Sequence, residues 1–237
     1  MKFALIGHPV AGSLSPRLIA AAYDGRHSYD LLDFEHFEDA WAAFVAGYDG
    51  INVTAPFKQD AFAKVDVLSS RAQATGAVNL VVRSADGFAG YNTDVDGVLD
   101  ALKETDVSFA DALVVGTGGA ARAAVHAAQL LGCRVTVTGR SKEKASALGC
   151  PAVSFEEAAL LQPDVVIYTL PGRAPVPDGL PFKDAVVLEA EYRIPQLTGV
   201  PCRQYVSGRR WMLGQAVAGY RIFTGEEPSL DKMRKVL

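Results

Sequence analysis

The sequence predicts an α/β protein with two domains, each built on a sheet that helices cover. Short apolar runs rich in branched residues alternate with helical patterns along most of the 237 residues, and this alternation is typical of parallel sheets. The chain is longer than the roughly 100–150 residues of a usual single domain. Residues 104–110 are polar and aperiodic, and they interrupt the alternation. We therefore expect one domain over 1–104, completed by 211–237, and a second domain over 105–210.

The first half predicts successive strand–helix units followed by a hairpin. Ser15-Pro16 marks the start of the first helix, because serine favours the N-cap and proline the first helical turn. The turn sequence Ser84-Ala85-Asp86-Gly87 separates two apolar runs, which is typical of a β-hairpin. The expected strands are 3–6, 29–32, 50–53, 78–83 and 88–91, and the expected helices are 15–23, 37–46, a segment from about 57, and 95–102.

The second half predicts a doubly wound α/β domain. The first of its strands runs directly into a glycine-rich turn and an alanine-rich helix. The expected strands are 112–115, 134–138, 165–169 and 186–188, and the expected helices are 120–131 and about 211–223. The last helix follows all of these strands, and we expect it to return to the first domain.

Composition and charge exclude several classes of protein. Hydrophobic residues make up 49% and charged residues 21%, which is ordinary for a folded chain. Lys and Arg number 23 against 27 for Asp and Glu, so a nucleic-acid partner is not expected. No apolar stretch approaches the roughly 18 residues of a membrane span, and residues 1–7 are too short for a signal-peptide core. We expect a cytoplasmic protein without a membrane partner.

Cysteine and histidine usage argues against disulfides and metal. Cys133, Cys150 and Cys202 are odd in number and lack the spacing C-x-x-C, so reduced thiols are expected. The four histidines show no metal-ligand spacing. We predict no metal site.

The strongest local signal is a glycine-rich turn between a strand and a helix. Gly116-Thr117-Gly118-Gly119-Ala120-Ala121 fits the pattern G-x-G-x-x-A. Glycine here permits a tight turn and close approach of the backbone to pyrophosphate, while N–H groups at the helix start favour an anion. A glycine turn without a ligand is the structural alternative. We expect a Rossmann-like dinucleotide site at this turn.

The next strand indicates which dinucleotide would bind. NAD-specific sites carry Asp or Glu about 20 residues beyond the glycines, where the acid accepts the ribose hydroxyls. Here the strand ends in Thr138-Gly139-Arg140-Ser141-Lys142, without an acid. Because a guanidinium pairs bidentately with phosphate, Arg140, Ser141 and Lys142 favour NADP(H) over NAD. The alternative is that Arg140 and Lys142 are solvated cations at a helix start.

Four polar clusters lie near the ends of strands in the first half, and open α/β sheets bind ligands at the carboxyl ends of their strands. Taken singly, the serines suit a cap and turn, Lys58 a surface lysine, and Asp94 a helix cap. Asn79 enters an apolar strand, so its amide needs partners if it is buried. The clusters are Ser13-Leu14-Ser15-Pro16, Asn52-Val53-Thr54-Ala55-Pro56-Phe57-Lys58, Gly76-Ala77-Val78-Asn79 and Asn92-Thr93-Asp94.

In this order, the motifs resemble those of the shikimate dehydrogenase family over almost the whole chain. Gln215-Ala216 and Phe223-Thr224-Gly225 look like the closing helix of that family. The resemblance implies a substrate domain followed by an NADP-binding domain. The family patterns Gly-x-Pro, Ser-x-Ser-Pro, Asn-Val-Thr-x-Pro-x-Lys, Gly-Ala-Val-Asn, Asn-Thr-Asp-x-x-Gly and Gly-x-Gly-Gly-Ala-Ala-Arg-Ala stand here at 7–9, 13–16, 52–58, 76–79, 92–97 and 116–123.

What the resemblance implies is the reversible reduction of 3-dehydroshikimate to shikimate by NADPH, in aromatic amino acid (chorismate) biosynthesis. The reduction of a ketone develops negative charge on oxygen, so a donor must supply a proton or stabilise the alkoxide. Lys58 is the candidate, with Asp94 orienting it; both a proton shuttle and a fixed electrostatic stabiliser stay open. The implied substrate contacts are Ser13, Ser15, Thr54, Asn79, Asp94, Tyr192 and Gln215.

The chain departs from the family pattern in places. Asn-Arg-Thr is Gly139-Arg140-Ser141 here, and Gly-Leu-Gly-Met-Leu is Gly208-Arg209-Arg210-Trp211-Met212. Arg210 replaces a glycine expected near the nicotinamide, where it would crowd the pocket or add a cation. A quinate/shikimate dehydrogenase of broader substrate and cofactor use and a catalytically silent metabolite-binding relative are the alternatives. The oligomeric state is expected to be a monomer or a homodimer.

Overall fold

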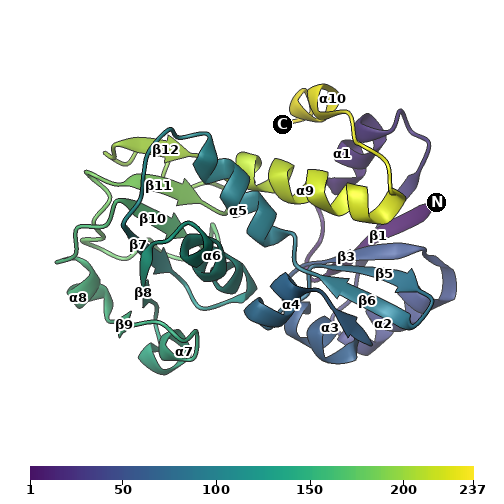
Figure 1. Ribbon diagram of the computed structural model, residues 1–237, viewed down its shortest axis with the longest axis horizontal. Helices are drawn as coiled ribbons and strands as arrows, with labels where there is room; N and C mark the ends of the chain where they lie inside the picture. The colour runs from purple at the N-terminus through teal and green to yellow at the C-terminus, as the bar shows by residue number, and fades with distance from the viewer. The chain divides into compact units, whose positions relative to one another are not determined.

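Two six-stranded sheets organise the chain, and each belongs to a separate compact unit (Figure 1). The computed structural model describes all residues from 1 to 237. Unit 1 comprises Met1–Thr93 and Gln215–Leu237, and unit 2 comprises Asp94–Gly214. The predicted α/β fold, with its returning carboxyl-terminal segment, is confirmed.

Helix α5 (Asp94–Lys103) is assigned differently by the sequence and by the structure. The predicted boundaries, at 104/105 and 210/211, give α5 to the first domain, whereas in the structure it packs within unit 2. Val95, Val98 and Leu102 of α5 are buried in one core with the small alanines of α6 (Gly119–Leu130). The apolar stripe of α5 finds its packing partner there, because alanine side chains let two helices approach closely.

The sheet of unit 1 mixes parallel and antiparallel pairs in the order β2-β1-β3-β5-β6-β4. Strand β1 lies between β2 and β3 and is parallel to both, while β5 and β6 form the predicted hairpin with Ser84 opposite Gly87. The elements of unit 1 are β1 (Lys2–Gly7), α1 (Ser15–Ala22), β2 (Ser28–Asp33), α2 (Phe37–Gly47), β3 (Gly50–Val53), α3 (Lys58–Lys64), β4 (Val67–Leu68), α4 (Ser70–Thr75), β5 (Leu80–Ser84), β6 (Gly87–Tyr91), the end of α9 (Gly208–Thr224) and α10 (Leu230–Arg234).

Aromatic contacts hold the returning segment in unit 1. Phe223 stacks on Phe3 of β1 with ring centroids 4.4 Å apart. The hydroxyl of Tyr220 donates to the backbone oxygen of Ser15 at 3.1 Å, and the hydroxyl of Tyr23 donates to the backbone oxygen of Tyr220 at 3.0 Å. The closing helix therefore completes the core above β1 and α1.

Unit 2 is a parallel sheet in the order β12-β11-β10-β7-β8-β9. Renumbered within the unit, this is the 6-5-4-1-2-3 order of a dinucleotide-binding fold, whose ligand crevice opens where the strand order reverses, here between β7 and β10. The elements of unit 2 are α5, β7 (Asp111–Val115), α6, β8 (Arg134–Thr138), α7 (Lys142–Ser146), β9 (Ala152–Val153), α8 (Phe155–Ala158), β10 (Val165–Tyr168), β11 (Val186–Glu189), β12 (Gln204–Val206) and the start of α9.

The central strands of unit 2 are buried on both faces. Val165 and Ile167 of β10 enter the core beneath α5 and α6, while Val166 and Tyr168 enter the opposite core with Phe182. A near-continuous apolar run such as Val-Val-Ile-Tyr is what a parallel strand covered on both sides requires. The strand predictions in this half rest on such runs, and the strands are present.

Short elements and one helix cap differ from the prediction. Strands β4, β9 and β12 and helices α4, α7, α8 and α10 hold two to six residues each, too few to show a period. Ser15 is not the cap of α1, because Leu14 occupies that position without a side-chain cap. Pro16 does stand in the first turn, as predicted.

None of the helices combines the length and apolar character that a membrane-spanning segment needs. The three cysteines are unpaired. No three His, Cys, Asp or Glu side chains lie together in a group that could hold a metal ion.

Candidate functional site

The carboxyl ends of β1 and β3 bring two of the predicted motifs side by side. The N–H of Thr54 donates to the backbone oxygen of Ile6 at 2.9 Å, and the N–H of His8 donates to that of Ala55 at 3.0 Å. A Cβ added at Gly7 would lie 2.3 Å from Thr54 Cγ2, so only glycine permits this approach. Thr54 is thereby held next to the start of the loop that carries the serines.

A hydrogen-bonded pair, His8 and Asp33, shapes that loop. The Nδ1 of His8 donates to Asp33 Oδ1 at 2.6 Å, and the N–H of Val10 donates to Asp33 Oδ2 at 3.1 Å. The hydrogen bond from His8, followed by that from Val10, holds the pKa of the Asp33 carboxyl below its ordinary value. The loop that follows β1 is thus fixed from the end of β2.

Ser13 and Ser15 form a pair of neighbouring hydroxyls. Ser13 Oγ donates to Ser15 Oγ at 3.1 Å and accepts from the N–H of Ser15 at 3.3 Å. Ser15 is buried, while Ser13 is half-buried. Since Tyr220 donates to the backbone oxygen of Ser15, the pair is also anchored to α9.

Asn79 and Gln215 are joined directly. Asn79 is 2% exposed, and its Nδ2 donates to Gln215 Oε1 at 3.1 Å and to Thr93 Oγ1 at 3.2 Å. Its Oδ1 accepts from the backbone N–H of Thr93 at 2.8 Å. The partners that a buried asparagine requires are therefore residues of two other predicted motifs.

Lys58 is the first residue of α3 and is half-buried. Its backbone oxygen accepts from the N–H of Val78 at 2.9 Å, which ties the start of α3 to the segment that leads to Asn79. The N–H of Phe57 donates to the backbone oxygen of Thr54 at 3.0 Å, and this tight turn delivers the chain into the helix. Ser13, Ser15, Thr54, Lys58, Asn79 and Gln215 all belong to unit 1.

Asp94 and Tyr192 belong to unit 2. Asp94 directly follows Thr93 and begins α5, and it is 4% exposed. The indole Nε1 of Trp211 donates to Asp94 Oδ1 at 3.3 Å. Tyr192 is half-buried in the segment after β11.

The glycine loop lies at the point where the strand order of unit 2 reverses. Gly116 has φ +124°, a region that residues with a Cβ rarely adopt, and an added Cβ would lie 2.2 Å from Thr169 Oγ1, just after β10. A Cβ at Gly118 would meet nothing within 4 Å. Gly118 caps α6 without a side-chain hydrogen bond, which leaves the first amides of the helix open to an anion. The loop therefore fits a pyrophosphate.

The chain after β8 passes beside this loop, and its side chains differ in the partners that they contact. A Cβ at Gly139 would lie 2.9 Å from Thr117 Cγ2. Arg140 is exposed, whereas Lys142 Nζ pairs with Glu157 Oε2 at 3.2 Å. Ser141 Oγ accepts from the N–H of Lys144 at 3.2 Å and caps α7. Both side chains are exposed, and Lys142 in addition pairs with an acid.

Arg210, which stands where the family pattern has a glycine, pairs with an acidic side chain. Arg210 Nη1 lies 2.6 Å from Glu104 Oε2, which follows α5. Position 208 keeps the glycine of the family pattern. A side chain there would be crowded, because an added Cβ would lie 2.6 Å from the backbone oxygen of Glu189. The guanidinium of Arg210 thus forms an ion pair with Glu104.

A buried acid that the sequence pattern did not indicate ends β11. Glu189 is fully buried, and its carboxylate accepts from the N–H of Gln196 at 2.7 Å, the N–H of Leu197 at 3.2 Å and the hydroxyl of Tyr205 at 2.8 Å. The only sequence signal was an acid ending an apolar strand. The three donors make its role structural.

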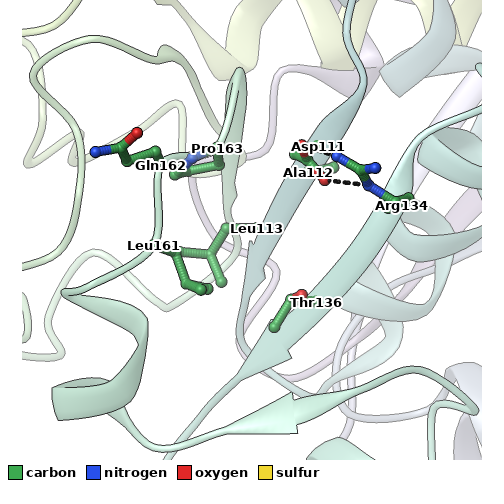
Figure 2. A pocket seen from close by; sticks show the side chains of 8 residues that line it. All are labelled: Asp111, Ala112, Leu113, Arg134, Thr136, Leu161, Gln162 and Pro163. Carbon is green, nitrogen blue, oxygen red and sulfur yellow. Dashed lines mark hydrogen bonds and ion pairs between the residues drawn. The ribbon is translucent and has the colours of Figure 1, made fainter.

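A cavity of about 230 Å³ lies at the amino ends of β7 and β8 (Figure 2). Arg134 faces it but forms a bidentate pair with Asp111 at 2.7 and 2.5 Å. Parallel sheets bind ligands at the opposite, carboxyl edge. None of the predicted site residues lines this cavity.

Comparison with known proteins agrees with these motifs. Residues 5–81 match the family described as shikimate dehydrogenase substrate binding domain. A shikimate dehydrogenase (NADP(+)) of Thermus thermophilus is 32% identical over 255 residues, covering 99% of this chain and 97% of the relative. The crystal structure of shikimate 5-dehydrogenase from Thermus thermophilus in complex with NADP(H) and shikimate has a TM-score of 0.85 at 30% identity, covering 100% of both chains.

A third comparison concerns quinate dehydrogenase from Corynebacterium glutamicum in complex with NAD. Its TM-score is 0.85 at 27% identity, covering 100% of this chain and 98% of that one. The 32% identity to the Thermus enzyme over nearly both full lengths decides the assignment. The chain belongs to the shikimate dehydrogenase family.

Proposed function

We propose that this protein catalyses the reversible reduction of 3-dehydroshikimate to shikimate with NADPH, as an oxidoreductase of aromatic amino acid (chorismate) biosynthesis. The observation that carries the proposal is the joint presence of a connected set of hydroxyl and amide groups in unit 1 and an anion-binding glycine loop in unit 2. Family membership supplies the substrate class.

The substrate is a cyclic polyol carboxylate, which needs several fixed polar partners. We assign this role to Ser13, Ser15, Thr54, Asn79 and Gln215 of unit 1, and to Asp94 and Tyr192 of unit 2. The support is that the first five are held by backbone and side-chain hydrogen bonds, so little entropy is lost when they bind a ligand.

When bound, the cofactor supplies a hydride to the ketone carbon. The electron pair of the C=O bond then moves to oxygen, and the ammonium of Lys58 donates a proton to that oxygen or stabilises its charge. A proton or a positive charge delivered to that oxygen is what the direction of reduction requires. Asp94 accepts a hydrogen bond from a substrate hydroxyl.

The cofactor site comprises the glycine loop and the residues after β8. Gly116, Thr117, Gly118, Gly119, Ala120 and Ala121 hold the pyrophosphate, and Arg140, Ser141 and Lys142 hold the ribose phosphate of NADP(H). The exposed guanidinium of Arg140 carries most of this preference, because Lys142 already pairs with Glu157.

A quinate/shikimate dehydrogenase of broader specificity is the second candidate function. The similarity to a quinate dehydrogenase solved with NAD favours it. Arg140 favours NADP over NAD, because NAD-specific sites carry an acid in this region instead of a basic residue. A cytoplasmic location and a monomeric or homodimeric state belong to the same proposal.

The test is the initial rate of NADP reduction with shikimate, followed by NADPH absorbance, run beside quinate and with NAD in place of NADP. Turnover with shikimate and NADP alone is the expected result. Turnover with quinate or with NAD would establish the broader enzyme. Shikimate binding without turnover of any pair would contradict both and identify a silent relative.

A further inference from the structure

We propose that Trp211 is a positioning residue that holds the Asp94 carboxylate in its substrate-binding orientation. The inference rests on the proposed function and deepens it. Trp211 is 4% exposed, and its Nε1 donates to Asp94 Oδ1 at 3.3 Å across 117 residues of sequence. An indole N–H only donates and a carboxylate only accepts, so the pair has one possible polarity.

Two glycines allow α5 and α9 to approach closely enough for the hydrogen bond between Trp211 and Asp94. A Cβ at Gly97, one turn after Asp94, would lie 2.5 Å from both Cδ1 and the backbone oxygen of Trp211. A Cβ at Gly214, one turn after Trp211, would lie 3.0 Å from the Cα of Gly97. Residues three apart share a helix face, so α5 and α9 each present a polar group and a glycine to the other.

A second contact fixes the same turn of α9. Arg210, the neighbour of Trp211, pairs with Glu104 beyond the end of α5 at 2.6 Å. The indole is therefore held by packing and by its adjacent residue, and it restricts rotation of the Asp94 carboxylate before substrate arrives. A carboxylate that is already fixed loses little conformational entropy when it accepts a hydrogen bond from a substrate hydroxyl.

The experiment is a double-mutant cycle of Trp211→Phe and Asp94→Asn, with KM for shikimate and kcat measured at saturating NADP. Trp211→Phe is expected to raise KM about tenfold with a much smaller effect on kcat, because a hydrogen bond to a charged group is lost. In the Asp94→Asn background the same change should have almost no further effect on KM. Effects that multiply would overturn the proposal.

Replacement Trp211→benzothienylalanine separates the donor from the packing, since this residue keeps the bicyclic shape and lacks the N–H. It should reproduce the KM of Trp211→Phe with wild-type thermal stability. Wild-type KM in this variant would overturn the positioning role. Absence of shikimate turnover in the wild type would instead refute the proposed function.

Fluorescence gives a readout besides activity, because the chain has 2 tryptophans. Trp41→Phe is the matched control: Trp41 is 7% exposed in the core of unit 1, and its loss should leave KM unchanged. Trp211 is then the only tryptophan of the chain, and its emission is excited selectively at a wavelength where the tyrosines do not absorb. Shikimate should change its emission, and the change should vanish when Asp94→Asn is added. An equal change in both proteins would contradict coupling through Asp94.

Discussion

Asn79 and Thr93 hold each other through side-chain and backbone groups at once. The Thr93 N–H donates to Asn79 Oδ1 at 2.8 Å, and Asn79 Nδ2 donates to Thr93 Oγ1 at 3.2 Å. The same Nδ2 reaches Gln215 Oε1 at 3.1 Å. One buried amide therefore fixes both the residue that precedes Asp94 and the segment that returns to unit 1.

Removal of this amide should destabilise the protein as well as weaken substrate binding. Asn79→Ala leaves the Thr93 N–H buried without its acceptor, so the free energy of unfolding should fall by about 1–3 kcal/mol. Urea unfolding measures the loss. Gln73→Ala is the control, because Gln73 is exposed on α4 of the same unit. Equal stability of the two variants would contradict a structural role for Asn79.

Lys58→Ala should reduce turnover far more than substrate affinity. Loss of a positioned proton donor costs about 10²–10⁴-fold in rate. The measurement is kcat and KM for shikimate with NADP. Lys64→Ala is the matched control, since Lys64 ends the same helix and pairs with Glu38 at 2.9 Å. Unchanged turnover in Lys58→Ala would rule out its catalytic role.

Arg140→Ala should remove the preference for NADP. The loss of a charge-assisted bond to the ribose phosphate should raise KM for NADP about 10–100-fold and leave KM for NAD nearly unchanged. Lys142→Ala should have a smaller effect, because Lys142 pairs with Glu157. Initial rates with both cofactors test this. A parallel rise for NAD and NADP would show that Arg140 does not read the phosphate.

Gly116 and Gly118 should respond differently to alanine. At Gly116 the positive φ and the closeness of Thr169 oppose a Cβ, so Gly116→Ala should destabilise the protein by at least about 1 kcal/mol. Gly118→Ala meets no neighbouring atom and should leave stability unchanged, yet weaken NADP binding by blocking the pyrophosphate. Thermal unfolding and NADP titration separate the two effects. A fully stable Gly116→Ala variant would contradict the strain argument.

Tyr168→Phe should leave stability unchanged or raise it at neutral pH. The Tyr168 hydroxyl is fully buried and its oxygen has no hydrogen-bond partner, so its removal relieves a desolvation cost. Tyr205→Phe is the contrasting variant, because it strips Glu189 of a donor and should cost about 1–3 kcal/mol. Urea unfolding compares them. A similar loss in both variants would contradict the distinction.

The same residue gives a prediction for alkaline pH. Burial, and then the nearby Glu189 carboxylate, raises the pKa of Tyr168 from an ordinary 10.0 to about 12. The folded form thus keeps a proton that the unfolded form loses, so stability should decline as pH rises from about 10 to about 12. The decline should be shallower in Tyr168→Phe. An identical pH profile in both proteins would refute the shift.

Local pattern determined most of the elements and most of the candidate site. The apolar runs at β1, β3, β7 and β10 and the glycine turn 116–121 specify their own conformation, because strand burial, helix periodicity and turn chemistry act over a few residues. The order of the motifs sufficed to identify the family.

Only the tertiary structure decided which residues meet. Asn79 pairs with Gln215 across 136 residues, and Asp94 pairs with Trp211 across 117. Sequence pattern also could not assign α5 to unit 2. These outcomes depend on how closely two helices approach and on the register of distant strands, which are set by packing of the whole core rather than by neighbouring residues.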